Sequence, residues 1–366
     1  MAYSSRQSTR SELEFTTSEL TGALGDSVTV LPLLVALAMT TSVSLPHVLV
    51  GFGVFQIVWG LYYGMPLSVE PMKALLGLAV VGSLSYPELA AAGLLAGGVL
   101  LAVGSLGLVD RLQRIVGEPV IRGVQFAVAL LLLEAAVGLS VGNLPVAAAG
   151  LAVVAALALV GYRRTSVLVV LALGGIAAVV ATGIPTLRAP ELALFPAGAP
   201  TVSTAALEGT VAQLGMTVGN AAIATALLCG DLYDRDVSAD SLSKSMGVTC
   251  LAAIPVGGVP MCHGSGGLAG KYAFGARTGG ANVLLGLGYL ALALVAAGAL
   301  LAAFPMALLG VLLVVVAAEL GRAAFEPVTD ARSLALVVAV GVSGLAINVG
   351  LAFVLGAVGW WLLSRG

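Results

Sequence analysis

Two interrupted stretches of the chain carry residue types that could bind an anion. The first, GMPLSVEPMKALLG (residues 64–77), brings Ser68, Val69, Glu70 and Lys73 into an otherwise apolar region. Proline lacks an N–H donor and restricts the residue before it, so a helix can begin only after it. We expect this helix to begin near Ser68, with Lys73 about one and a half turns inside it. Its free N–H groups and partial positive charge would attract an oxyanion.

The second stretch, GGVPMCHGSGGLAG (residues 257–270), has the same arrangement. Its serine hydroxyl can donate a hydrogen bond, its glycines permit close approach of the backbone to a ligand, and its histidine could exchange a proton near neutral pH. The candidate anion ligands of this stretch are His263, Gly264, Ser265, Gly266 and Gly267. The alternative for each is structural, because serine and glycine often serve close packing between membrane helices.

Charged and amide side chains in apolar surroundings form a second group of candidates. Glu70 could form a salt bridge with Lys73 at i,i+3, or it could bind a proton, since burial favours a neutral carboxyl group. Asp26 could likewise bind a proton or accept a bond between helices, and Asn220 could hydrogen-bond the anion. Gln56 and Gln125 are secondary polar candidates, with packing as the default interpretation. Glu134 and Glu319 lie late in their spans and are expected to reach the interface or to cap a neighbouring helix.

The composition requires lipid around these stretches. Hydrophobic residues make up 59% of the chain, charged residues only 9%, and the mean hydropathy is +1.09, so polar surface cannot cover a soluble globule. About 20 apolar residues are needed to cross the hydrocarbon layer, and segments starting inside the membrane are shorter. We therefore predict an all-α multi-pass membrane protein with about 14 spans, the third and tenth being half-helices. The predicted spans are 21–39, 47–63, 68–84, 88–108, 118–139, 144–161, 165–183, 205–229, 239–256, 263–275, 279–302, 305–320, 332–348 and 350–363.

The distribution of basic residues predicts the orientation. With both termini in the cytoplasm, fourteen of the 16 lysines and arginines fall on the inner side or at inner helix ends, including Lys271. Only Arg188 falls outside, and Lys73 lies within a span. This bias follows the positive-inside rule and predicts a protein of the cytoplasmic membrane. Residues 1–20 are polar and are expected to form a cytoplasmic tail.

An internal repeat relates the two halves. A displacement of 194 residues places GDSVTVLPLL (25–34) on GNAAIATALL (219–228), and it also places residues 64–68 on residues 258–262 without a gap. Seven spans in each half would make the repeat inverted. The expected divisions are the tail 1–20, a first repeat 21–183, an extracellular linker 184–204 and a second repeat 205–366.

The segment VPMCHGSGGLAGKYAFGARTGG (259–280) resembles the signature of the molybdate transporter family, a branch of the sulfate permease superfamily. Similar stretches are GALGDSVTVLPLL (22–34), VIRGVQFAVAL (120–130), FPMALLGVLLVVVAAEL (304–320) and the first interrupted stretch. The resemblance implies a fold of seven plus seven inverted spans, divided into a core with the two broken helices and a gate. It also implies that the regulatory domain of typical sulfate permeases is absent. The family commonly has glutamine at the position of Glu70.

These observations lead us to expect a secondary transporter of molybdate or a related tetrahedral oxyanion such as tungstate or sulfate, working by alternating access. Because a dianion enters against the membrane potential, and no GxxxxGK[ST] loop is present, proton symport is expected. A nucleobase or organic anion carrier of the same fold is an alternative. Its members resemble a pattern with an acid in the eighth span, whereas TVGNAAIATALL (217–228) has none. An anion channel of the same fold is a further alternative.

Enzymatic activity is not expected, since the two histidines, His47 and His263, offer no nucleophile–base pair or metal cluster. We expect no cofactor, metal or nucleic acid, and a homodimer is one assembly that the chain could form. The odd cysteine count and the absence of metal-like spacing predict that Cys229, Cys250 and Cys262 serve packing.

Overall fold

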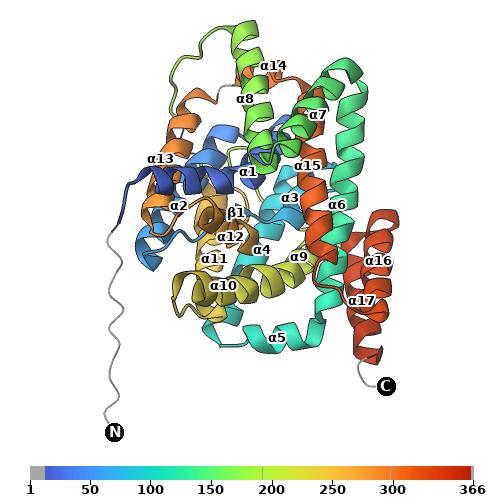
Figure 1. Cartoon of the computed structure of the whole chain (residues 1–366). Coiled ribbons are helices and arrows are strands. Elements are labelled where there is room, and N and C mark those ends of the chain that lie inside the picture. The colour runs from blue at the N-terminus through green and yellow to red at the C-terminus, as the bar shows by residue number, and fades with distance from the viewer. Residues whose placement is uncertain (1–12, 192, 297, 364–366) are drawn as a thin grey trace, which may run out of the picture.

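The structure, a computed structural model, describes residues 13–191, 193–296 and 298–363, and these form a helical protein (Figure 1). The helices of the first half are α1 (Thr17–Thr40), α2 (Leu45–Tyr63), α3 (Lys73–Val80), α4 (Tyr86–Ser105), α5 (Val109–Val116), α6 (Glu118–Val141), α7 (Leu144–Leu159) and α8 (Arg163–Thr182). Those of the second half are α9 (Thr204–Met216), α10 (Ala224–Tyr233), α11 (Ala239–Ala253), α12 (Ser265–Ala273), α13 (Gly280–Val295), α14 (Gly298–Ala303), α15 (Met306–Phe325), α16 (Ala331–Ala346) and α17 (Val349–Leu363). A π-helical segment, η1 (Thr217–Ile223), joins α9 to α10, and a 3-10 turn, η2 (Ile254–Val256), follows α11.

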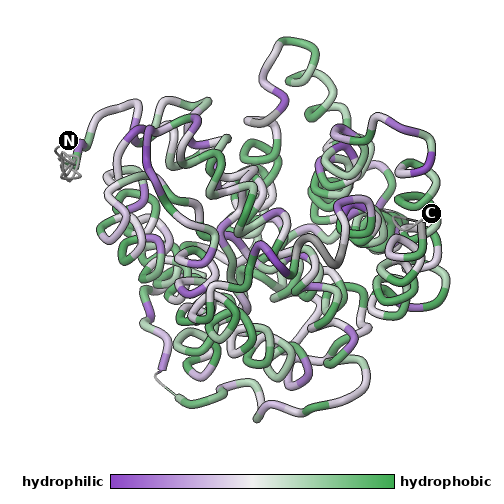
Figure 2. Tube along the Cα trace, turned by 90° about the horizontal axis from the view of Figure 1, so that it is seen from below, coloured by the Kyte–Doolittle hydropathy of each residue, from purple (hydrophilic) through white to green (hydrophobic). Residues whose placement is uncertain are grey.

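The predicted class, an all-α multi-pass membrane protein, is confirmed. Each of the predicted spans contains a helix, and apolar positions cover most of these helices (Figure 2). Seven helices are long and apolar enough to cross a bilayer, and α7, α13, α16 and α17 are shorter apolar helices. The total of 14 spans remains a prediction. Of the predicted tail, residues 1–12 lie outside the described residues, as do Arg6, Arg10 and Arg365 of the charge distribution, and α1 begins at Thr17.

Helix packing has the symmetry that a repeat would produce. Helix α2 packs on α13, and α11 packs on α4. Glycines allow both close approaches, because a Cβ on Gly53 of α2 would lie 2.9 Å from the Gly286 oxygen, and one on Gly247 of α11 would lie 2.7 Å from the Gly97 oxygen. Gly53 and Gly247 are separated by 247 − 53 = 194 residues, the displacement of the predicted repeat. This packing supports the inverted repeat as a proposal.

Two very short strands, β1 (Glu70–Pro71) and β2 (Met261–Cys262), lie within the interrupted stretches and pair with each other in antiparallel orientation. Glu70 pairs with Cys262 and Pro71 with Met261, and the Met72 N–H donates to the Pro260 oxygen at 2.9 Å. The extended backbone persists through Met72, which is the N-cap of α3. Lys73 is therefore the first residue of α3 instead of lying one and a half turns inside it, because the pairing of Pro71 with the second stretch delays the helix start.

Candidate functional site

A cavity of about 180 Å³ separates the starts of α3 and α12 from α6, α8 and α15. It brings together most of the residues that the sequence singles out as anion ligands. The predicted residues that line it are Glu70, Lys73, Gln125, Asn220, Gly264, Ser265, Gly266 and Gly267. These come from both interrupted stretches, from η1 and from α6, so the two halves of the chain converge on one site.

The start of α12 offers backbone donors to this cavity. Gly264 is its N-cap, and among the described residues the N–H groups of Ser265, Gly266 and Gly267 have no hydrogen-bond acceptor. The Ser265 hydroxyl donates to the Asn220 side-chain oxygen at 2.9 Å. Asn220 lies in η1, where the wider π-helical turn is of a kind that often occurs at functional sites. A Cβ on Gly266 would meet open space. This helix end can therefore donate several hydrogen bonds to an oxyanion.

The start of α3 is different, because its amides already have an acceptor. The Gln213 side-chain oxygen on α9 accepts the N–H groups of Ala74 and Leu75 at 2.9 and 3.2 Å. The expectation of free N–H groups at both helix starts is thus wrong for these two residues of α3. What α3 contributes instead is the Lys73 ammonium, whose Nζ lies 2.5 Å from the Glu70 Oε2. The i,i+3 salt bridge considered for Glu70 is present.

Behind the cavity lies a fully buried polar network centred on Asp26. The Ser68 hydroxyl donates to the Asp26 Oδ1 at 2.7 Å, and the Gln56 amide donates to its Oδ2 at 3.0 Å. The Lys271 Nζ lies 3.1 Å from the same Oδ2 and also donates to the Gln56 and Asn282 oxygens at 3.0 and 2.7 Å. Five side-chain oxygens, the Gln56 amide nitrogen and one ammonium satisfy one another here, as buried charges require.

Lys271 lies in the last turn of α12, a helix end as predicted, but it does not reach the protein surface. Its side chain is 0% exposed, because α12 starts deep in the protein and is only 9 residues long, so the second turn of the helix is still inside. The partner Asp26 lies 245 residues earlier in the chain (271 − 26). Asp26 and Lys271 each interrupt an apolar stretch. A buried acid and a buried base need each other as partners, and this could have indicated the pair from the sequence.

Glycine at position 267 allows the acidic side chains to lie against the start of α12. A Cβ on Gly267 would overlap with the Glu70 Oε1, the Ser68 Oγ and the Asp26 Oδ1, and one on Gly264 would overlap with the Glu70 carboxylate. The Glu70 carboxylate therefore sits between Lys73 and the first turn of α12. It lies where a bound anion would also be attracted.

Several predicted residues lie beside the cavity but do not line it. Ser68, Val69, Asp26 and Gln56 belong to the buried layer behind it, where the Val69 oxygen accepts from the Gln56 amide at 3.2 Å. The His263 ring is also buried, with its Nδ1 2.9 Å from the Ser68 oxygen and its Nε2 2.7 Å from the Ser245 hydroxyl. These contacts suit the structural alternative for the histidine, which ties the two stretches together.

The other predicted polar residues have separate positions. Gln125 lines the cavity, but its side-chain oxygen accepts from Arg122 at 3.0 Å. Glu134 is exposed. The three cysteines, Cys229, Cys250 and Cys262, are buried free thiols, in agreement with a packing role. Within the part of the chain that the structure describes, no group of three histidine, cysteine or acidic residues could hold a metal ion.

Two charged residues of the cavity were not predicted as part of the site. Arg163, the first residue of α8, and Glu319 on α15 both line it, with the Arg163 Nη2 2.5 Å from the Glu319 Oε1. The sequence had indicated an inner loop for Arg163 and an interfacial or capping position for Glu319. Their partnership depends on the packing of α8 against α15, which hydropathy alone does not specify.

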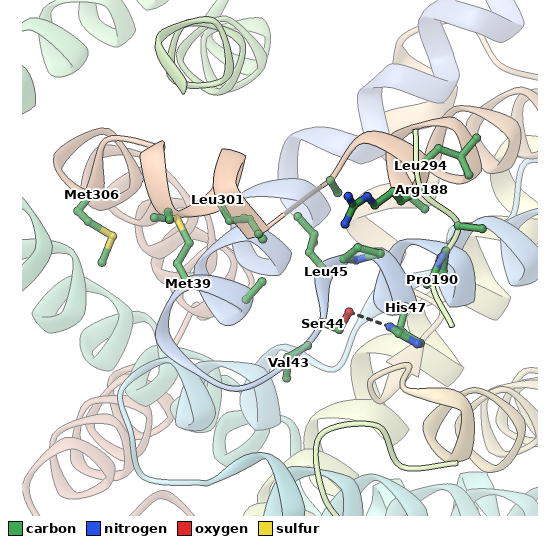
Figure 3. Close-up of a pocket in the computed structure, with 17 residues that line it drawn as sticks. Met39, Val43, Ser44, Leu45, His47, Arg188, Pro190, Leu294, Leu301 and Met306 are labelled. Carbon is green, nitrogen blue, oxygen red and sulfur yellow. Dashed lines mark hydrogen bonds between the residues drawn. The ribbon is translucent and has the colours of Figure 1, made fainter. Parts of the chain in front are cut away.

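A separate cavity of about 620 Å³ lies elsewhere, among α2, α13, α14 and the 184–204 linker (Figure 3). It contains Arg188 and His47 but none of the predicted ligands. The His47 Nδ1 lies 2.7 Å from the Ser44 hydroxyl, and its Nε2 lies 2.7 Å from the Glu191 backbone oxygen. His47 therefore fastens the linker to the start of α2.

Comparison with solved structures shows which fold surrounds the candidate site. The transmembrane domain of a cyanobacterium bicarbonate transporter, BicA, matches with a TM-score of 0.67 at 20% identity, over 92% of this chain and 97% of that chain. SLC26A9 matches with a TM-score of 0.72 at 13% identity, over 95% of this chain and 65% of that chain. The chain thus has the fold of these anion transporter membrane domains.

Sequence comparison shows the family. Molybdate transporter 1 of Arabidopsis thaliana is 30% identical over 93% of this chain and 86% of its own length, and molybdate transporter 2 of the same plant is 29% identical over 95% and 87%. A family model described as "Molybdate transporter of MFS superfamily" matches residues 18–132 and 205–320. These relatives are named as transporters, which confirms the expectation that the chain is not an enzyme. The chain therefore belongs to the molybdate transporter family.

Proposed function

We propose that this chain carries molybdate, or a related tetrahedral oxyanion, across the cytoplasmic membrane, with the anion bound in the cavity at the start of α12. One observation carries the proposal: the free N–H groups of Ser265, Gly266 and Gly267 and the Lys73 ammonium face a single cavity. The names of the relatives agree with this substrate class.

The arrangement suits a tetrahedral dianion because its donors come from two helix starts. Amides at the start of α12, with the Ser265 hydroxyl, supply directed hydrogen bonds. The Lys73 ammonium at the start of α3 supplies a full positive charge. Charge-assisted hydrogen bonds of this kind are shorter and stronger than neutral ones, and a small cavity excludes most of the competing water.

The Glu70 carboxylate gives the site a means of coupling to protons. With Glu70, Asp26, Lys73 and Lys271 all ionised, the four side chains sum to zero, and a dianion would bring the site to −2. Protonation of Glu70 would remove one negative charge and release Lys73 to the anion. Each charge moved against 100 mV costs about 2.3 kcal/mol, so entry of the dianion with protons lowers this barrier.

The position of the cavity supports alternating access as the mode of transport. One wall is formed by the starts of α3 and α12 with α1 and η1, and the other by α6, α8 and α15. Movement of one wall past the other would carry the bound anion between the two faces of the membrane. In this proposal both termini lie in the cytoplasm, as the distribution of basic residues predicts.

The test is uptake of labelled molybdate into proteoliposomes, with and without an inward proton gradient, and in competition with tungstate and sulfate. We expect uptake to rise with the gradient. Glu70→Gln keeps the shape of the side chain and removes its charge, so it should keep anion binding but lose the dependence on the gradient. Uptake by the wild type and by Glu70→Gln that is equally indifferent to the gradient would refute proton coupling, and no uptake of any of the three anions would refute the substrate class.

A further inference from the structure

A second cation–carboxylate pair stands where the site cavity meets a wider one. The cavity of about 180 Å³ and a neighbouring cavity of about 620 Å³ share three lining residues, Arg163, Glu319 and Ala323. We call these three residues the neck. The Arg163 Nη2 and the Glu319 Oε1 lie 2.5 Å apart across it. An ion that moved between the two cavities at this contact would pass the pair.

The fold gains little from the pair. The two side chains are 42% and 38% exposed, and an ion pair in such surroundings contributes about 0–1 kcal/mol. Arg163 is also the first residue of α8, where its charge faces the positive end of the helix dipole. Arg163 is thus a cation at the unfavourable end of a helix dipole, with its carboxylate partner across the neck. Binding of an anion explains this position better than a contribution to the stability of the fold does.

The neck repeats the chemistry of the site itself. Among the described residues that line the site cavity, Lys73 and Arg163 are the cations, and each is paired with a carboxylate, Glu70 or Glu319. Among the described residues, Arg322 and Glu326 are the other charged residues that line the wider cavity.

We propose that Arg163 is a second oxyanion-binding residue, at which a tetrahedral oxyanion takes the place of the Glu319 carboxylate as it passes the neck. The inference rests on the proposed function. A guanidinium group can donate two parallel hydrogen bonds to either a carboxylate or an oxyanion, so one partner can replace the other without loss of bonding.

The test compares Glu319→Gln and Arg163→Gln by calorimetric binding of molybdate to the purified full chain and by uptake into proteoliposomes. Glu319→Gln leaves Arg163 without its carboxylate, so molybdate should bind about threefold to tenfold more tightly and be released more slowly, which lowers the maximal uptake rate. Arg163→Gln leaves an uncompensated carboxylate at the neck, so binding should weaken by a similar factor. A merely structural salt bridge would not give opposite shifts in affinity, because both variants lose the same bond.

Glu88→Gln is the matched control, because it also converts one carboxylate to an amide, at the start of α4 and away from the lining of both cavities. The neck subsite is overturned if the wild type binds and transports molybdate while both neck variants keep the affinity of the control, or shift it in the same direction. If Arg163→Gln does not fold, Arg163→Lys replaces it, and unchanged affinity in that variant also overturns the proposal. Failure of the wild type to bind molybdate, tungstate or sulfate instead refutes the proposed function, and the neck subsite with it.

Discussion

The starts of α3 and α12 are equivalent under the 194-residue displacement, yet they contribute opposite features to the site. The displacement places Glu70 on Gly264 and Lys73 on Gly267, so the charged residues of the first half correspond to glycines in the second. The contacts explain why, because a Cβ at either glycine would overlap with the Glu70 carboxylate. One half supplies charge, and the other supplies the space and the free backbone donors that this charge needs. An asymmetric site can thus arise within symmetric helix packing.

The second lysine of the region extends this comparison. Lys271 corresponds to Gly77 of α3, and it is fully buried against Asp26, whereas Lys73 is partly open to the cavity with a side chain that is 15% exposed. A cation with three oxygen partners in the interior serves the fold. A cation with one carboxylate partner at the cavity surface is available to a ligand.

The largest expected effect separates these two lysines. Lys271→Met leaves Asp26 buried without a counter-charge, and it should destabilise the protein by about 3–5 kcal/mol. Lys73→Met should cost less stability, because water in the cavity can reach the released Glu70, but it should abolish molybdate uptake. Thermal unfolding in detergent and uptake into proteoliposomes measure both. The double variant Asp26→Asn, Lys271→Met should recover most of the lost stability, and equal destabilisation by the two single lysine variants would contradict this division.

The next effect concerns adjacent glycines of α12. Gly267→Ala should destabilise the protein by about 3 kcal/mol and abolish uptake, since its Cβ would overlap with Glu70, Ser68 and Asp26. Gly266→Ala is the matched control, because its Cβ meets open space and the stability should change by less than about 0.5 kcal/mol. The new methyl group would project into the cavity, so the control should fold normally and bind molybdate more weakly. If the two variants unfold at the same temperature, the proposed role of Gly267 as room for the carboxylates is wrong.

Local chemistry made much of this site predictable. Pro71 and Pro260 mark extended backbone before short helices, and the Ser265–Gly267 sequence is suited to a helix start that is open to a ligand. The periodic apolar runs likewise predicted a helix in each span, because proline, glycine and charge punctuate them wherever the chain turns.

The partners across long separations were not predictable. Gln213 lies 139 residues from the Ala74 amide that it accepts, and Lys271 lies 245 residues from Asp26. Such pairs depend on which helices pack side by side, and the hydropathy pattern does not specify this. A rule that counts basic residues by membrane side therefore gave no sign that Lys271 is buried, since it assumes that lysines near span ends reach water.

The smallest expected effect tests why a neutral glutamine covers the start of α3. Gln213→Ala leaves the buried N–H groups of Ala74 and Leu75 without an acceptor, so it should cost about 1–2 kcal/mol of stability with little change in affinity for molybdate. Gln213→Glu keeps the acceptor and suits the helix dipole, which offsets only part of the cost of burying a carboxylate at a position that is 1% exposed, so this variant should also lose stability. Its added negative charge would repel the anion, and an extra repulsion of about 1 kcal/mol weakens binding about fivefold. Calorimetric binding of molybdate and thermal unfolding of both variants test this role of Gln213. If Gln213→Glu binds molybdate as tightly as the wild type, the neutrality of the Gln213 side chain has no part in anion recognition. The difference between the starts of α3 and α12 would then serve folding alone.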